Sequence, residues 1–192
     1  MGFEEICLGP FCAGSCPRVA VIGSMWQQTV LNAVADIIES ASRVVTVASF
    51  IFTLTKSSPA AARIRAGIVR AARRGLDVLV LLDGGREMAK EYNCGTARVL
   101  GMRGVDIWLT RGATLHMKVY AADSLAIVGS ANISSQESLE LAVMIESEEV
   151  ANTIHRSIRM LRDKYGATWE SICRERGGAK QRSKNAVEVE AV

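Results

Sequence analysis

Two strongly apolar runs, each preceded by a segment of helical periodicity, constrain the fold of this chain more than any other feature. The runs cover residues 43–53 and 77–83. They are rich in β-branched residues and apolar on both faces, which is typical of central strands. Apolar side chains recur every three or four positions over residues 26–41 and 60–74, the second segment ending at Gly75, so both segments predict amphipathic helices.

The rest of the chain continues this alternation. The patterns predict a helix, a strand, two short strands around a turn, another strand and a closing helix, over residues 86–101, 105–109, 115–128, from Leu141 onward, and 148–165. Because the connections are short, the economical architecture is an α/β fold with a mixed, mostly parallel central sheet and helices on both faces.

The chain divides into three regions by composition. Residues 1–25 form a Cys-containing N-terminal arm, residues 26–173 hold the alternating elements of one domain, and residues 174–192 form a basic tail without apolar periodicity. The length of 192 residues fits one domain of ordinary size. We therefore expect a single domain over residues 26–173, with an N-terminal arm before it and a mobile basic tail after it.

Composition excludes several classes of protein. Hydrophobic residues at 49% and charged residues at 22% exclude global disorder and a collagen-like repeat. The net charge of +3 permits a polyanionic partner without establishing one. The first twenty residues contain Glu4 and Glu5 and no basic residue before Arg18, so they do not form a secretory signal, and no apolar stretch is long enough to span a membrane. We expect a soluble, cytoplasmic protein.

The five cysteines do not form a recognisable disulfide framework, because their number is odd and three of them crowd the first sixteen residues. Cys7, Cys12 and Cys16 are similar to an incomplete metal site that lacks a fourth ligand nearby. Disulfide bonding, plain burial or a cross-link between two copies of the chain are the preferred interpretations. No metal site is predicted.

The residues that point to chemistry lie between positions 116 and 140. His116 and Lys118 are two residues apart, so in an extended segment an imidazole and an ammonium project from the same face. The imidazole can attack phosphorus or donate a proton, and the ammonium can offset charge on the nonbridging oxygens of a phosphodiester. Ser130 and Asn132, again two residues apart, supply further hydrogen-bond donors.

This pattern resembles the phospholipase D superfamily, whose signature is H-x-K, four residues, D, six residues and G-S-x-N. His116, Lys118 and Asp123 keep that spacing, as do Gly129, Ser130 and Asn132, and the segment between the two halves is one residue shorter than usual. The first predicted strand and the helix-to-strand segment ending at Asp83 also resemble the family. The similarity covers roughly residues 26–165 and matches the single-motif members, such as the Nuc-like endonucleases and mitochondrial cardiolipin hydrolases.

The resemblance implies a phospholipase D-like fold and a two-step mechanism with a phosphohistidine intermediate. One histidine attacks phosphorus, and a second protonates the leaving oxygen. The other histidine of this chain, His155, has neither a lysine two residues later nor a following G-S-x-N, and is expected at the surface or in a dimer contact. The resemblance therefore implies a homodimer that brings two copies of His116 together, without a cofactor. Glu140 is assigned the role of orienting His116, and Asp123 is interpreted as a turn or structural residue.

These features predict a metal-independent nuclease acting on DNA or RNA. A phospholipase, such as a cardiolipin hydrolase, is the first alternative, and a nucleic-acid-binding module without turnover is the second. Five arginines between residues 63 and 74 form either a phosphate-tracking surface or the solvated face of a helix, and three of them are candidate substrate-binding residues: Arg63, Arg70 and Arg74. The basic tail could add nonspecific affinity for nucleic acid.

Overall fold

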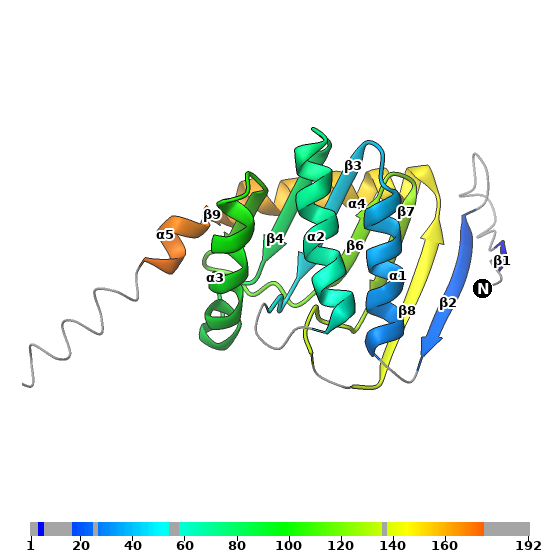
Figure 1. Ribbon diagram of the computed structural model, residues 1–192, viewed down its shortest axis with the longest axis horizontal. Coiled ribbons are helices and arrows are strands. Elements are labelled where there is room, and N and C mark those ends of the chain that lie inside the picture. Colours follow the sequence, from blue (N-terminus) through cyan, green and yellow to red (C-terminus); the bar gives the residue numbers. More distant parts are fainter. Residues whose placement is uncertain (1–3, 6–16, 25–26, 54–57, 136–137, 175–192) are drawn as a thin grey trace, which may run out of the picture.

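A nine-stranded sheet runs through the computed structural model of the protein, which describes residues 4–5, 17–24, 27–53, 58–135 and 138–174 (Figure 1). The strands along the chain are β1 (Glu4–Glu5), β2 (Arg18–Ser24), β3 (Val44–Ser49), β4 (Asp77–Leu82), β5 (Asp106–Thr110), β6 (Lys118–Ala122), β7 (Leu125–Gly129), β8 (Glu140–Glu146) and β9 (Gly166–Thr168). The helices are α1 (Gln27–Ser40), α2 (Pro59–Arg73), α3 (Glu87–Gly101), α4 (Glu148–Tyr165) and α5 (Trp169–Cys173). Across the sheet the strand order is β1-β2-β8-β7-β6-β3-β4-β5-β9.

The sheet is mixed, as predicted, but the expectation that it is mostly parallel is wrong. Only β3 with β4 and β4 with β5 pair in parallel, and the other pairings given for the described strands are antiparallel. The reason lies in the connections. Helices α2 and α3 return the chain to the same edge before β4 and β5, whereas a tight turn joins β6 to β7 and reverses its direction.

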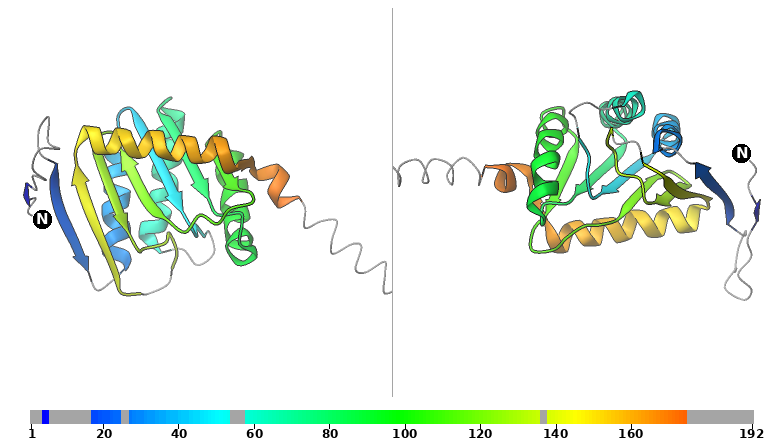
Figure 2. Two further views of the ribbon diagram at one scale, coloured as in Figure 1. Left: turned by 180° about the vertical axis from the view of Figure 1, so that it is seen from behind. Right: turned by 90° about the horizontal axis from the view of Figure 1, so that it is seen from below.

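Helices cover both faces of the sheet, which confirms that part of the prediction. Helices α1, α2 and α3 lie on one face and α4 crosses the other (Figure 2). Under the first three helices the main core gathers Val45 and Val47 of β3 with Leu31 of α1 and Ile64 of α2. A smaller cluster packs the other face of the sheet against Ile158 of α4. Alternate residues of β3 thus point to opposite faces, which explains why its sequence is apolar throughout.

Strand β2 was not predicted, since residues 18–24 were assigned to the N-terminal arm. It pairs with β8 over its full length, from Arg18 beside Glu146 to Ser24 beside Glu140, and therefore belongs to the sheet. Its apolar run is only four residues long, between Arg18 and Gly23, which is too short to stand out by periodicity.

A disulfide between Cys94 and Cys173, separated by 79 residues, joins α3 to α5. The cysteine pattern did not predict this pair, because two cysteines that far apart give no local signal. Cys7, Cys12 and Cys16, and the tail from residue 175 onward, lie outside the described residues.

Candidate active site

The directions of four strands bring the residues of the H-x-K and G-S-x-N segments to one edge of the sheet. Strand β3 ends where β6 begins, because the two are antiparallel and Ser49 pairs with Lys118. The next two strands reverse in turn, so Gly129 at the end of β7 lies beside Ala142 of β8. We call this the catalytic edge, the lower edge of the sheet in Figure 1.

His116 and Lys118 lie together at the catalytic edge. Lys118 Nζ is 3.5 Å from His116 Nε2 and donates a hydrogen bond of 2.9 Å to the His116 carbonyl oxygen. The ring of Phe50 packs against both, with its centroid 4.8 Å from that of the imidazole and 5.3 Å from Lys118 Nζ. His116 is exposed, whereas Lys118 is only 7% exposed. An anion that contacts the imidazole is therefore also within reach of the ammonium.

The environment of Lys118 is set by two opposing effects. Burial lowers the pKa of its ammonium, and the negative charge of Glu140 acts in the opposite direction. The ammonium is thus partly desolvated, and its attraction for a phosphate oxygen is stronger than that of a lysine in water.

Ser130 and Glu140 contact each other directly. The Ser130 hydroxyl donates to Glu140 Oε2, and the Ser138 hydroxyl donates to Glu140 Oε1 over 2.6 Å. Within the described part of the chain, no hydrogen bond joins Glu140 to His116, so the expected orienting contact is absent from this structure. Glu140 instead holds the two serines in place and reaches Lys118 through its charge.

Asn132 is fixed in the same region by backbone contacts. Its Oδ1 accepts a hydrogen bond from the Ile51 amide over 3.2 Å, and its carbonyl oxygen accepts one of 2.5 Å from the buried Gln27 side chain. Because Asn132 Oδ1 accepts this hydrogen bond, the nitrogen of the same side-chain amide is the group with which Asn132 can donate to a ligand. Gly129 precedes this segment for a steric reason: a Cβ there would lie 2.6 Å from the Leu141 oxygen and 2.7 Å from Ala142 Cβ.

Asp123 lies at the opposite edge of the sheet from His116. It occupies the turn between β6 and β7 with φ of 50°, and its carboxylate accepts hydrogen bonds from the backbone amides of Ser42, Arg43 and Val44 and from the Ser42 hydroxyl. Burial would raise its pKa, but these hydrogen bonds together lower the pKa to about 2. Its contacts tie the β6–β7 turn to the start of β3, which fits a structural role.

His155 is not the surface residue that was expected. It is 5% exposed, and its Nδ1 lies 2.8 Å from the Thr46 hydroxyl, while its Nε2 is buried without a hydrogen-bond partner. Burial lowers its pKa. His155 lies on the apolar face of α4, which packs against the sheet. The many charged residues in the sequence of α4 concealed this apolar face.

Of the three candidate substrate-binding arginines, Arg63 and Arg70 lie on α2 and Arg74 caps its C-terminal end. Arg63 Nη2 forms ion pairs of 2.8 Å with Asp36 and 2.6 Å with Glu39, and Arg70 pairs with Glu39 over 3.0 Å. Arg74 donates to the Ala41 carbonyl oxygen. Helix α1 and the residue that follows it thus supply acidic or carbonyl partners to all three.

The sequence analysis missed a buried polar side chain of α3 that holds the backbone at the catalytic edge in place. Asn93 of α3 is fully buried and accepts a hydrogen bond of 2.8 Å from the Phe52 amide while donating to the carbonyl oxygens of Phe50 and Asp83, each over 2.8 Å. The Asp83 carboxylate accepts a hydrogen bond of 2.7 Å from the Leu115 amide, next to His116. The only sequence signal for this network was a polar residue at an apolar position of a helix.

Arg86 also escaped the sequence analysis. Its guanidinium lies 5.9 Å from the centre of the Phe50 ring, the ring that also contacts His116 and Lys118. It follows β4 directly, so it belongs to the same edge of the sheet.

The arrangement suits an anionic group that bears several oxygens. An imidazole, an ammonium and an amide lie at one edge, and a phosphate accepts hydrogen bonds from all three, while the Ser130 hydroxyl beside them donates to Glu140. Among the described residues, no group of three or more His, Cys, Asp and Glu side chains gathers as a metal site would require. In the same part of the chain, no helix combines the length and the apolar character needed to cross a membrane.

Comparison with known proteins identifies one matching family. The profile of a family described as cardiolipin synthase, PLD-like domain, matches residues 34–162. No curated protein sequence matches the chain.

Three solved structures have a similar fold. Nuc, a phospholipase D family member from Salmonella typhimurium, is 21% identical with a TM-score of 0.61, covering 79% of this chain and 97% of its own. NucT from Helicobacter pylori is 18% identical with a TM-score of 0.56, covering 79% and 98%. Phosphatidylserine synthase from Haemophilus influenzae is 14% identical with a TM-score of 0.64, covering 88% and 40%.

Proposed function

The chain belongs to the phospholipase D superfamily, and from that premise we propose that it is a metal-independent phosphodiesterase that hydrolyses DNA or RNA as a homodimer. The observation that supports this most directly is the pairing of His116 with Lys118 at 3.5 Å, beside Ser130 and Asn132. The similarity to Nuc and NucT, each of which this chain covers almost completely, favours a small enzyme of the same kind.

In the proposed first step, an imidazole nitrogen of His116 attacks phosphorus and the bond to the leaving oxygen breaks. The His116 of a second copy gives its proton to that oxygen. In the second step water attacks the phosphohistidine, the phosphorus–nitrogen bond breaks, and the second imidazole takes the proton of the water. Atoms and charge balance without a cofactor.

Lys118 and its neighbours act on the nonbridging oxygens. The partly desolvated ammonium offsets the negative charge that develops in the transition state, and the Asn132 amide adds a hydrogen bond. The Ser130 hydroxyl, whose one proton goes to Glu140 in this structure, adds a second only when that proton turns from Glu140 to the phosphate. Since Ser130 is held by Glu140, the carboxylate acts as a positioning residue that keeps this hydroxyl in place.

An apolar surface next to the site supports the dimer. Val21 of β2, Val128 of β7 and Leu141 of β8 are 62%, 39% and 60% exposed. They are neighbours in the sheet, because Val21 and Val128 each pair with Val143, on opposite sides of β8. A second copy that covered this surface would bury apolar area beside the catalytic edge.

A phospholipid is the second candidate substrate, and one observation favours it. Leu139 and Leu141 flank Glu140 and are 75% and 60% exposed, so acyl chains could lie beside the site. The description of the matching family profile points to the same class.

The test is cleavage by the purified protein in excess EDTA, with labelled single-stranded and double-stranded DNA, RNA and phospholipid vesicles as substrates. We expect nucleic acid to be cleaved without metal, and His116→Asn to be folded but inactive. Lys118→Ala should lose about 10²–10³ in rate, the usual cost of losing one preorganised donor. Arg98→Gln, an exposed change on α3 away from the catalytic edge, is the control.

Two results would overturn the proposal. Activity that requires a divalent ion would contradict the metal-independent mechanism. Cleavage of phospholipid without cleavage of any nucleic acid would move the second candidate to first place.

A further inference from the structure

A groove of about 590 Å³ lies between α2 and α3, away from the catalytic edge. Four arginines line it, three from α2 and one from the turn after α3, together with apolar side chains and no acidic residue: Arg65, Arg70, Arg73 and Arg103. A groove with one sign of charge along low-dielectric walls concentrates counter-ions of the opposite sign.

The arginines of the groove differ from those that α1 neutralises. Arg70 belongs to both sets, because it lines the groove and also pairs with Glu39, the same carboxylate that pairs with Arg63. In the part of the chain that the structure describes, no salt bridge joins Arg73 or Arg103 to an acidic residue, and the Arg103 guanidinium donates only to the Val99 carbonyl oxygen of α3. The two guanidinium groups are therefore available to an external anion.

Two positive charges also face each other across the groove. Burial lowers the pKa of Arg65, and the charge of Arg103 lowers it further. Such a like-charge pair destabilises the unoccupied groove, and an anion between the two helices would relieve the repulsion.

We propose that this groove binds the phosphate backbone of the nucleic acid whose scissile bond lies at His116, an inference that rests on the proposed function. The length of the groove favours a polymer over a single phosphate. The residues of α2 that line the groove extend from Ala62 to Arg73, which is roughly 16 Å along the helix axis. Successive phosphates of one DNA strand are about 3.4 Å apart along the duplex axis, so the groove is longer than a single phosphate requires.

The direction of α2 connects the groove with the catalytic edge. The helix begins after the loop that follows β3, at the edge that holds His116, and ends before Asp77, which pairs with Val44 at the opposite edge. A strand that passes His116 can therefore reach the groove along α2. This contact would bind long substrates more tightly than short ones and would leave the chemical step unchanged.

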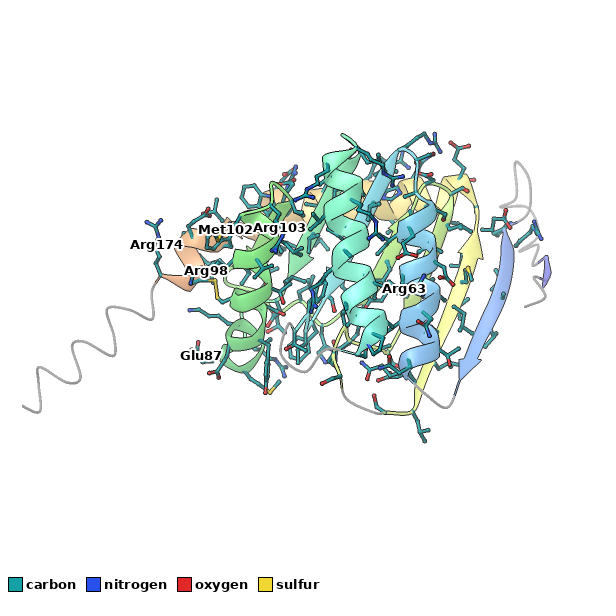
Figure 3. All side chains as sticks on the ribbon, in the orientation of Figure 1. Arg63, Glu87, Arg98, Met102, Arg103 and Arg174 are labelled. Carbon is teal, nitrogen blue, oxygen red and sulfur yellow. A yellow bond between two sulfur atoms is a disulfide. The ribbon has the colours of Figure 1, made fainter. Side chains whose placement is uncertain are left out.

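The experiment compares two double variants of the full chain with equal loss of charge. Arg73→Gln with Arg103→Gln removes two arginines of the groove. Arg98→Gln with Arg156→Gln removes two exposed arginines elsewhere. Arg98 lies on α3 and Arg103 in the turn after it; both are labelled in Figure 3, and of these two only Arg103 lines the groove.

Binding of a labelled oligonucleotide of about 20 nucleotides is measured against salt in a His116→Asn background, which prevents cleavage. We expect the groove variant to bind about tenfold more weakly and its log–log salt slope to fall by about 2, and the control to match the parent. With His116 present, the groove variant should cleave bis(p-nitrophenyl) phosphate at the parent rate and show a raised KM only for the oligonucleotide.

The outcomes separate the two proposals. If the parent cleaves the oligonucleotide but both double variants have the same salt slope, the groove does not bind the backbone and the proposed function stands. If the parent neither binds nor cleaves nucleic acid, the proposed function is wrong and the inference falls with it.

Discussion

At the scale of single residues, Asp123 belongs to the same sequence motif as His116, but we expect it to stabilise the fold and not to take part in catalysis. Its carboxylate accepts hydrogen bonds from three consecutive backbone amides, which begin at Ser42, and lies at the edge of the sheet opposite His116. The change Asp123→Asn keeps a side chain that tolerates positive φ and removes the charge. We expect a loss of about 1–3 kcal/mol in the free energy of unfolding, measured in urea at pH 7, and an unchanged cleavage rate for the folded protein.

The pH dependence of stability provides a second measure of the same residue. Because its folded pKa of about 2 lies below its ordinary value, Asp123 stabilises the fold above that ordinary value, and this contribution is lost as the pH falls towards 2. The difference in stability between the parent and Asp123→Asn should therefore shrink between about pH 4 and pH 2. A variant of parental stability that has lost cleavage would show instead that Asp123 acts in catalysis.

At the scale of elements, α3 supports the catalytic edge through Asn93. Removing the amide with Asn93→Ala leaves the Phe52 amide and two carbonyl oxygens without their buried partner. We expect a loss of about 2–4 kcal/mol in stability. We also expect a lower kcat at temperatures where the variant is fully folded, because Phe50, which packs against His116, is no longer held.

The matched control is Tyr92→Ala, the change of an exposed neighbour on the same helix. Thermal unfolding followed by circular dichroism, together with kcat and KM on one substrate, distinguishes the two effects. An Asn93→Ala protein that unfolds earlier but keeps the parental kcat would limit α3 to a purely structural role.

The elements also show which parts of this protein its sequence could predict. Long periodic segments such as α1 and α4 were predicted closely, as were β3 and β4, since burial on both sides leaves an unbroken apolar run. Strand β2 was missed because its partner β8 lies more than a hundred residues away, and pairing at that distance leaves no local pattern. The prediction of a mostly parallel sheet was wrong for a related reason. Which strands lie side by side, and in which direction, is decided by the whole fold and leaves no local pattern in the sequence.

The site was predictable to the extent that spacing alone brings residues together. His116 and Lys118 are adjacent through one extended segment, and both lie at the expected place. Asn93 and Arg86 come from other elements and meet Phe50 only after folding. The arginines of α2 were visible as a run, but only the packing of α1 and α3 decides which of them are neutralised.

At the scale of the whole molecule, the proposed mechanism requires two copies of the chain. It needs a nucleophile and a separate acid. The second histidine of the chain, His155, is a buried residue of α4 and lies beside Thr46. Strand β6 places Lys118 at one edge, and His155 contacts β3 near its start at the other edge, so the two histidines of one chain do not share a site. The missing group must come from a second His116.

Mixing experiments test this requirement directly. Parent chains unfolded and refolded with an excess of His116→Asn chains should lose activity more steeply than in proportion to their fraction, because each mixed dimer has only one of the two histidines. With random pairing at a parental fraction f, activity should follow about f² of the undiluted value. Chains carrying His155→Gln keep His116 and are the control, since mixing them with parent chains in the same way should leave the total activity unchanged. Sedimentation velocity should show a dimer at assay concentration. Full turnover by a strictly monomeric species, or a linear curve with His116→Asn, would mean that one chain supplies both the nucleophile and the acid.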